Sequence, residues 1–209
     1  MKFRFYAIKL SAIMILIFII QIIFNNFTEL FILNKESLIQ PWRFITAIFL
    51  HSSAIHLIYN LFALALFGSM LERILNWKKF LIIFFVTGVG ANLISFNFYD
   101  SSLGASGAIF GIIGALIILK PMMVIWAFGL PMPLFVAGIL WTAGDLMGAY
   151  WFLVGNPIDN TGNIAHLSGL LFGIIFGFLY RQKIPKMRKK EHLKIDESEM
   201  RKWEDSFLR

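Results

Sequence analysis

The chain has 209 residues, of which 58% are hydrophobic and 15% charged, and its mean hydropathy is +0.75. Soluble globular domains carry about 25% charged residues, so this composition excludes that class and indicates a protein that crosses a membrane several times. The net charge is +7, and the absence of cysteine excludes a disulfide framework, a zinc–thiolate site and a cysteine nucleophile.

Six apolar stretches approach the roughly 20 residues that a helix needs to cross about 30 Å of hydrocarbon. In chain order they are Leu10 to Phe24, Phe44 to Leu71, Phe80 to Phe96, Leu103 to Leu119, Pro133 to Leu153 and Ile164 to Tyr180. No small-residue cleavage site follows the first stretch, so we interpret it as a retained span rather than a signal peptide. We therefore predict an all-α membrane bundle of six helices over residues 10–181, between a short N-terminal segment, 1–9, and a basic, amphipathic tail, 182–209.

The distribution of basic residues predicts the orientation of these spans. Of the 19 lysine and arginine residues, all except Lys35 and Arg43 fall on the side that holds both termini. By the positive-inside rule this side is cytoplasmic, which predicts a multi-pass protein of the cell membrane. The basic charge is then explained by topology and by the lipid bilayer, and nucleic acid is not expected as a partner.

Four polar residues are predicted to lie at one depth. Ser106 opens the fourth span and His166 opens the sixth. At 1.5 Å per residue, Ser106, His166 and Asn60 lie about 20–22 Å above the inner face, and His56 lies about 26 Å above it. Polar side chains at this depth are costly and usually mark function, so we expect these four to converge in the outer half of the bilayer.

Glycines recur next to two of these positions. Gly169, Gly173 and Gly177 form a stripe on the helical face of His166, and Gly107, Gly111 and Gly114 form a similar stripe about 100° round the helix from Ser106. Stripes of small residues let membrane helices approach closely. Packing the two stripes together would bring Ser106 near His166.

This set of residues suits acyl transfer. A serine hydroxyl needs a base, and His166 is the natural candidate. No carboxylate lies near His166 in the sequence, so we infer a Ser–His dyad rather than a triad. The free backbone N–H of Ser106, with His56 and Asn60 at i, i+4 spacing, would stabilise the oxyanion. Asp145, about 18 Å up the fifth span, is expected to line a water-filled cavity or to bond a neighbouring helix, a structural role being favoured over a catalytic one.

Other classes of site are less well supported. The metalloprotease pattern H-E-x-x-H is absent, and His51 and His56 are five residues apart, which places them on different helical faces. We therefore expect neither a metal nor another cofactor, and we place His51 at the outer rim. A transporter is disfavoured because the chain lacks internal repeats and paired broken helices.

Taken in order, the motifs resemble those of the rhomboid intramembrane serine proteases over roughly residues 41–180. The elements that carry the resemblance are Trp42-Arg43, the H-x4-H-x3-N pattern of His51, His56 and Asn60, Glu72-Arg73, Gly104-Ala105-Ser106-Gly107, and Ala165-His166-Leu167-Ser168-Gly169 with Gly173. The resemblance implies Ser106 as the nucleophile, His166 as the general base, and an oxyanion hole of His56, Asn60 and the Ser106 backbone N–H.

The resemblance also implies a substrate class. The expected substrates are transmembrane segments of other membrane proteins, cleaved at a site that opens toward the extracytoplasmic side. Phe110 stands where some members have a tyrosine stacked near the catalytic histidine, and it joins His51, Gly104 and Asp145 as residues expected to line or support the cavity. The alternative is a catalytically silent member that binds membrane proteins in quality control. The physiological substrate and the oligomeric state are left open.

Overall fold

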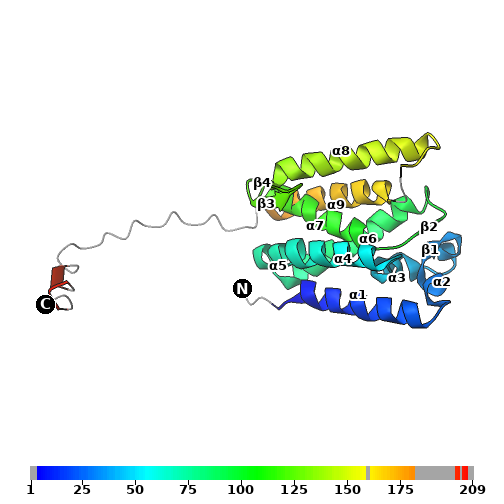
Figure 1. Ribbon diagram of the computed structural model, residues 1–209, viewed down its shortest axis with the longest axis horizontal. Coiled ribbons are helices and arrows are strands. Elements are labelled where there is room, and N and C mark those ends of the chain that lie inside the picture. The colour runs from blue at the N-terminus through cyan, green and yellow to red at the C-terminus, as the bar shows by residue number, and fades with distance from the viewer. Residues whose placement is uncertain (1–3, 159–160, 182–200, 203, 207–209) are drawn as a thin grey trace.

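The structure is a computed structural model that describes residues 4–158, 161–181, 201–202 and 204–206. It is a bundle in which the long helices lie side by side, with α1 and α8 on opposite sides (Figure 1). In chain order the elements are α1 (Tyr6–Ile23), α2 (Phe27–Phe31), β1 (Leu33–Asn34), η1 (Lys35–Leu38), α3 (Arg43–Thr46), η2 (Ala47–Phe49), α4 (Ala54–Ala63), η3 (Leu64–Gly68), α5 (Ser69–Leu75), α6 (Trp77–Ser95), β2 (Ser101–Ser102), α7 (Ser106–Leu119), β3 (Val124–Ala127), β4 (Leu130–Pro133), α8 (Leu134–Leu153) and α9 (Asn163–Arg181).

Each predicted span contains a helix, and five of these helices in the described residues are long and apolar enough to cross a membrane. They are α1, the continuous run Ala54–Leu75 formed by α4, η3 and α5, α6, α8 and α9. The chain is therefore a multi-pass membrane protein. The remaining helix, α7, has 14 residues, which makes it about 21 Å long against about 30 Å of hydrocarbon. The count of six spans stays a prediction.

The predicted start of the second span is wrong. Residues from Phe44 onward form the short helices α3 and η2, and the membrane helix begins at Ala54. The helix starts there because Ser53 is extended and its hydroxyl caps the helix, accepting a hydrogen bond from the His56 backbone N–H (3.1 Å). Apolar residues flank the short polar run His51-Ser52-Ser53 on both sides, so hydropathy averaged over about 20 residues does not reveal the break.

Arg43 holds the segment that precedes this break. The residue is 2% exposed, and its guanidinium donates to the backbone carbonyls of Glu29 (2.8 Å) and Ile32 (3.0 Å) and to the carboxylate of Glu36 (2.7 Å). A buried cation satisfied in this way ties α2 and η1 to the start of α3. The loop between α1 and α4 is thereby folded onto the bundle.

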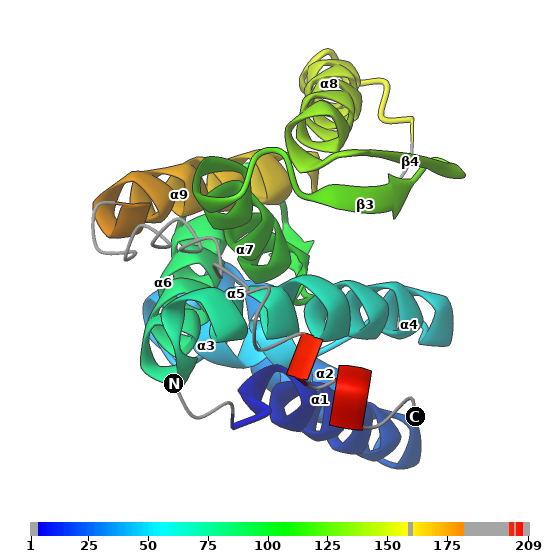
Figure 2. The same ribbon diagram turned by 90° about the vertical axis from the view of Figure 1, so that its left-hand side faces the viewer.

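The centre of the bundle is α7, which lies among α4, α6 and α9 (Figure 2). Most of its residues are buried. Glycines make the closest contact, because a Cβ added to Gly169 would overlap the carbonyl oxygen of Gly107, and one added to Gly173 would overlap that of Gly111. The two predicted glycine stripes therefore pack backbone against backbone.

The connection between α7 and α8 is a hairpin. Strands β3 and β4 pair antiparallel with Val124 opposite Pro133, and Pro133 immediately precedes α8. The predicted tail, 182–209, lies outside the described residues apart from 201–202 and 204–206.

Candidate active site

The turn before α7 brings one histidine close to Ser106. Gly104 has φ +119°, and a Cβ at this position would lie 2.8 Å from His56 Cε1 and 2.9 Å from Nε2. Glycine is required here both by the backbone conformation and by the ring. The His56 ring therefore packs against the turn that leads into Ser106, which is the first residue of α7.

His166 lies against the face of α7 that carries Ser106. Its ring stacks on Phe110, with ring centroids 4.3 Å apart and an angle of 6° between the planes. Phe110 follows Ser106 by one helical turn, so both side chains belong to the same face of α7. Phe110 therefore lies beside His166, one turn after Ser106.

Backbone contacts fix the helices on which these two residues sit. Gly107, next to Ser106, would carry a Cβ 3.5 Å from the carbonyl oxygen of Ala165, next to His166. The Gly107 carbonyl itself packs on Gly169. Because both partners of each contact adjoin the site, small movements of either helix would change the separation of Ser106 and His166.

The hydrogen-bond partner of the His166 ring is a carboxylate. Nδ1 lies 3.0 Å from Asp145 Oδ1, and Asp145, on α8, is 7% exposed. Among the described residues no hydrogen bond joins the ring to Ser106. Hydrogen bonds between catalytic groups are often long in unliganded enzymes and shorten when substrate binds.

The contact with Asp145 changes the expectation that no carboxylate would orient His166. That expectation considered only residues close to His166 in the sequence. Because α8 packs beside α9, it brings the distant Asp145 to the ring. A signal was present, because Asp145 and His166 project to similar depths, about 18 and 22 Å. Of the two roles expected for Asp145, bonding to a neighbouring helix is the one that the structure has.

The remaining predicted donors lie on α4. Asn60 is 5% exposed, and its amide donates one hydrogen bond to the His56 carbonyl (2.8 Å). His56 Nδ1 lies 3.1 Å from the Ser52 hydroxyl, which leaves Nε2 on the side of Gly104. A side-chain amide carries two N–H donors, so Asn60 keeps one for a ligand.

His51 supports this arrangement from behind. It is 2% exposed and meets the His56 ring edge-on, with centroids 5.1 Å apart, so its side chain is packed inside the protein. Burial, followed by the nearby His56, lowers the pKa of His51 to about 4 against an opposing backbone contact with Phe49. His51 is therefore neutral at physiological pH. Gln21 of α1 holds its backbone by accepting from the His51 N–H (3.0 Å) and donating to its carbonyl (3.2 Å).

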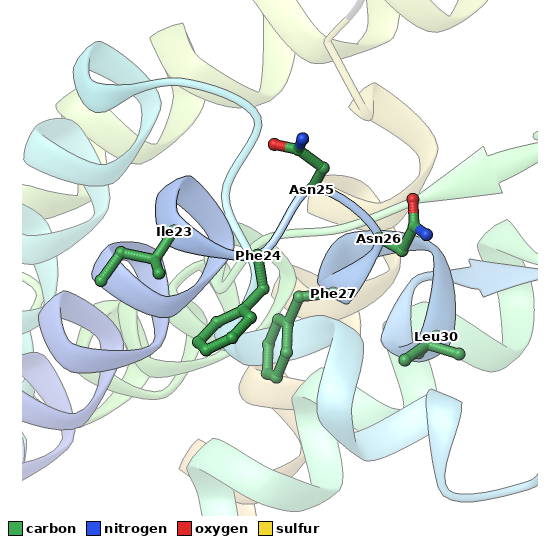
Figure 3. Close-up of a pocket in the computed structure, with 6 residues that line it drawn as sticks. All are labelled: Ile23, Phe24, Asn25, Asn26, Phe27 and Leu30. Atoms are coloured by element: carbon green, nitrogen blue, oxygen red, sulfur yellow. The ribbon is translucent and has the colours of Figure 1, made fainter.

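A surface pocket lies at the corner between α1 and α2 (Figure 3). The residues that line it are Ile23, Phe24, Asn25, Asn26, Phe27 and Leu30. The amides of Asn25 and Asn26 point to one side of the chain, whereas the rings of Phe24 and Phe27 point to the other (Figure 3). None of the predicted site residues lines this pocket, so the candidate site remains the cluster around Ser106 and His166.

Comparison with known proteins gives a consistent family. The model of the Rhomboid domain matches residues 38–183. RHOMBOID-like protein 6, mitochondrial, of Arabidopsis thaliana is 33% identical over 148 residues, which cover 67% of this chain and 44% of that protein. Rhomboid protease GlpG of Yersinia pseudotuberculosis is 27% identical over 146 residues, which cover 69% of this chain and 50% of that protein.

The chain thus spans half or less of the length of these relatives. The family match begins before α3 and ends after α9, so it includes every helix of the candidate site. Because it covers well over half of the chain, this protein belongs to the rhomboid family.

Proposed function

We propose that this protein is a serine-type endopeptidase that hydrolyses peptide bonds in or near transmembrane segments of other membrane proteins. The observation that carries the proposal is the stacking of His166 on Phe110, one turn from Ser106 on α7. Ser106 and a histidine base then share one small region of the bundle. Membership of a family that includes proteases supports this reaction type.

In the proposed reaction, Ser106 Oγ attacks the peptide carbonyl carbon while His166 Nε2 takes the hydroxyl proton. The tetrahedral intermediate collapses as the C–N bond breaks, and His166 returns the proton to the leaving amine. Water then attacks the acyl-serine ester, His166 takes a proton from it, and the carboxylic acid leaves as Ser106 regains its hydrogen.

The developing oxyanion is proposed to bind three donors. The backbone N–H of Ser106 belongs to the first turn of α7, where N–H groups lack intrahelical acceptors and the helix dipole is positive. His56 Nε2 beside Gly104 and the second N–H of Asn60 complete the set. Buried donors that are already in place stabilise negative charge more effectively than water does.

The short length of α7 supports this placement in the membrane. A helix of about 21 Å that ends at the inner face begins below the outer surface, so its N-terminal N–H groups are shielded by protein. The proposed topology has six spans in the cell membrane and both termini in the cytoplasm. The site then opens toward the extracytoplasmic side. Substrate helices would reach the site from the bilayer.

The proposal is tested with purified protein, a fluorophosphonate probe and a model transmembrane substrate. Wild type should be labelled and should cleave, whereas Ser106→Ala should do neither. His166→Ala should lose turnover while remaining folded. Ser168→Ala is the matched control, because its hydroxyl donates within its own helix to the Ile164 carbonyl (2.6 Å), and it should behave as wild type.

Two results would contradict the proposal. Cleavage retained in Ser106→Ala would exclude the serine mechanism. A wild type that is neither labelled nor active, yet binds membrane proteins, would instead be the catalytically silent alternative. For the oxyanion hole, Asn60→Ala should lower kcat by on the order of 10²-fold, and an unchanged kcat would remove Asn60 from it.

A further inference from the structure

The buried acid on α8 meets the ring that the proposed mechanism uses as its base. Asp145 Oδ1 lies 3.0 Å from His166 Nδ1, and the two side chains are 9% and 13% exposed. The contact joins two different helices, and α8 is otherwise apolar on most of its length. An ionisable side chain inside a membrane span is costly and is retained for a role.

The surrounding contacts show that Asp145 is aimed at His166 by packing of the helices. Gly148 follows Asp145 by three residues and lies on the same face of α8. A Cβ at Gly148 would be 2.8 Å from Asn163 Oδ1, and Asn163 precedes His166 by three residues on α9. The Asp145–His166 contact and the Gly148–Asn163 contact are three residues apart on each helix. Together they therefore hold one face of α8 against one face of α9.

The hydrogen bond has a chemical consequence for the ring. An ionised carboxylate only accepts hydrogen bonds, so Nδ1 must carry the proton. In the neutral ring Nε2 is then unprotonated. This is the tautomer that a histidine needs to take a proton from a serine, and Nε2 is the nitrogen left free for Ser106.

We propose that Asp145 is the positioning residue of His166, which makes the site a Ser–His–Asp arrangement rather than a dyad; the catalytic part of this inference rests on the proposed function. Asp145 fixes the Nδ1–H tautomer, holds the ring plane against Phe110, and stabilises the imidazolium that forms when Ser106 loses its proton. It does not contact the substrate.

Two other titratable side chains face this pair. His56 reaches it from α4 and interacts with the His166 charge. Tyr99, after α6, accepts a hydrogen bond from the Ile164 N–H (3.1 Å) and lies close enough to Asp145 to feel its charge. Of the groups that face His166, Asp145 is the acid that contacts its ring, so its removal should change the pH dependence of the base in a defined direction.

The first test reads the ring directly and needs no activity. Protein labelled with ¹⁵N-histidine contains four histidines, and the signal of His166 is assigned by comparison with His166→Gln. Wild type in detergent should show the Nδ1–H tautomer. Asp145→Asn should shift the population toward Nε2–H, because the amide can also donate to Nδ1. An unchanged tautomer would overturn the inference.

The second test reads catalysis. Asp145→Asn should lower kcat by on the order of 10- to 10⁴-fold with little change in KM, since an orienting carboxylate acts on the chemical step. The acidic limb of its kcat/KM profile should move to lower pH, because loss of the negative charge disfavours the imidazolium. Asp100→Asn is the control for charge, since the Asp100 side chain is 96% exposed, and it should match wild type.

The outcomes separate the two proposals. Wild-type kcat and an unmoved pH profile in Asp145→Asn, with Ser106-dependent activity in the wild type, would overturn the role of Asp145 and leave the protease assignment intact. An inactive wild type whose His166 tautomer depends on Asp145 would refute the protease assignment and keep the positioning contact. A lower kcat that merely follows a loss of folded protein, with the pH profile unmoved, would also overturn it.

Discussion

A single methyl group at Gly173 should disturb the site from a distance. An ideal Cβ there lies 2.6 Å from the carbonyl carbon of Gly111 and 2.8 Å from its Cα, whereas carbon atoms pack best at about 3.5–4.0 Å. In Gly173→Ala, α7 and α9 must therefore separate by about 1 Å. Overpacking of this kind costs about 1–3 kcal/mol, and a 1 Å displacement of reacting groups can cost on the order of 10²-fold in rate.

The matched control is Gly144→Ala on α8, where an added Cβ meets nothing within 4 Å. Both substitutions gain up to about 1 kcal/mol in helix propensity, so the difference between them isolates the clash. Unfolding by heat or SDS in detergent measures stability, and cleavage of a transmembrane substrate measures kcat. If Gly173→Ala were as stable and as active as Gly144→Ala, the backbone contact between α7 and α9 would not position the site.

Two buried charges outside the site give further predictions. Arg43→Met removes the guanidinium that binds the loop between α1 and α4 and leaves the carbonyls of Glu29 and Ile32 without this donor. It should destabilise the protein by about 1–3 kcal/mol, with faster proteolysis of that loop; an unchanged unfolding midpoint would contradict this role. Glu72 accepts from the backbone N–H groups of Arg4 (3.0 Å) and Tyr6 (2.8 Å) at the start of α1. Because an amide replaces one acceptor with a donor, Glu72→Gln should cost about 1.5–3 kcal/mol and speed hydrogen exchange in the first turn of α1, and equal exchange rates would refute the cap.

Much of the fold is readable from local pattern. Each of the six apolar stretches contains a helix. The reason is that hydropathy averaged over about 20 residues indicates whether a helix lies in lipid or in water. The start of the second span was misplaced because Phe44 to Leu50 is as apolar as a span. The membrane helix after that segment starts at the polar cap of Ser53, and the buried Arg43 holds the start of the segment itself. Single polar residues of this kind change the average hydropathy little.

The sequence predicts the site only through depth, which follows from position along a straight helix. Rise per residue alone predicts that Ser106, His166, His56 and Asn60 lie at one level. Depth is one coordinate of three, however. Depth does not say which helices are neighbours or how each helix is rotated about its axis. The stacking of His166 on Phe110 is therefore expected only from the family resemblance.

The sequence by itself indicates a multi-pass membrane protein of the rhomboid family, and it predicts Ser106 and His166 at similar depth beside glycines that permit close packing. Only the tertiary structure decided that α8 lies against α9 with Asp145 on Nδ1 of His166. The physical reason is that hydropathy and spacing act along one chain segment at a time. Which atom of a ring meets which oxygen depends on the rotation and separation of two helices, and these are set by backbone contacts such as Gly173 on Gly111 and by the packing of Gly148 on Asn163.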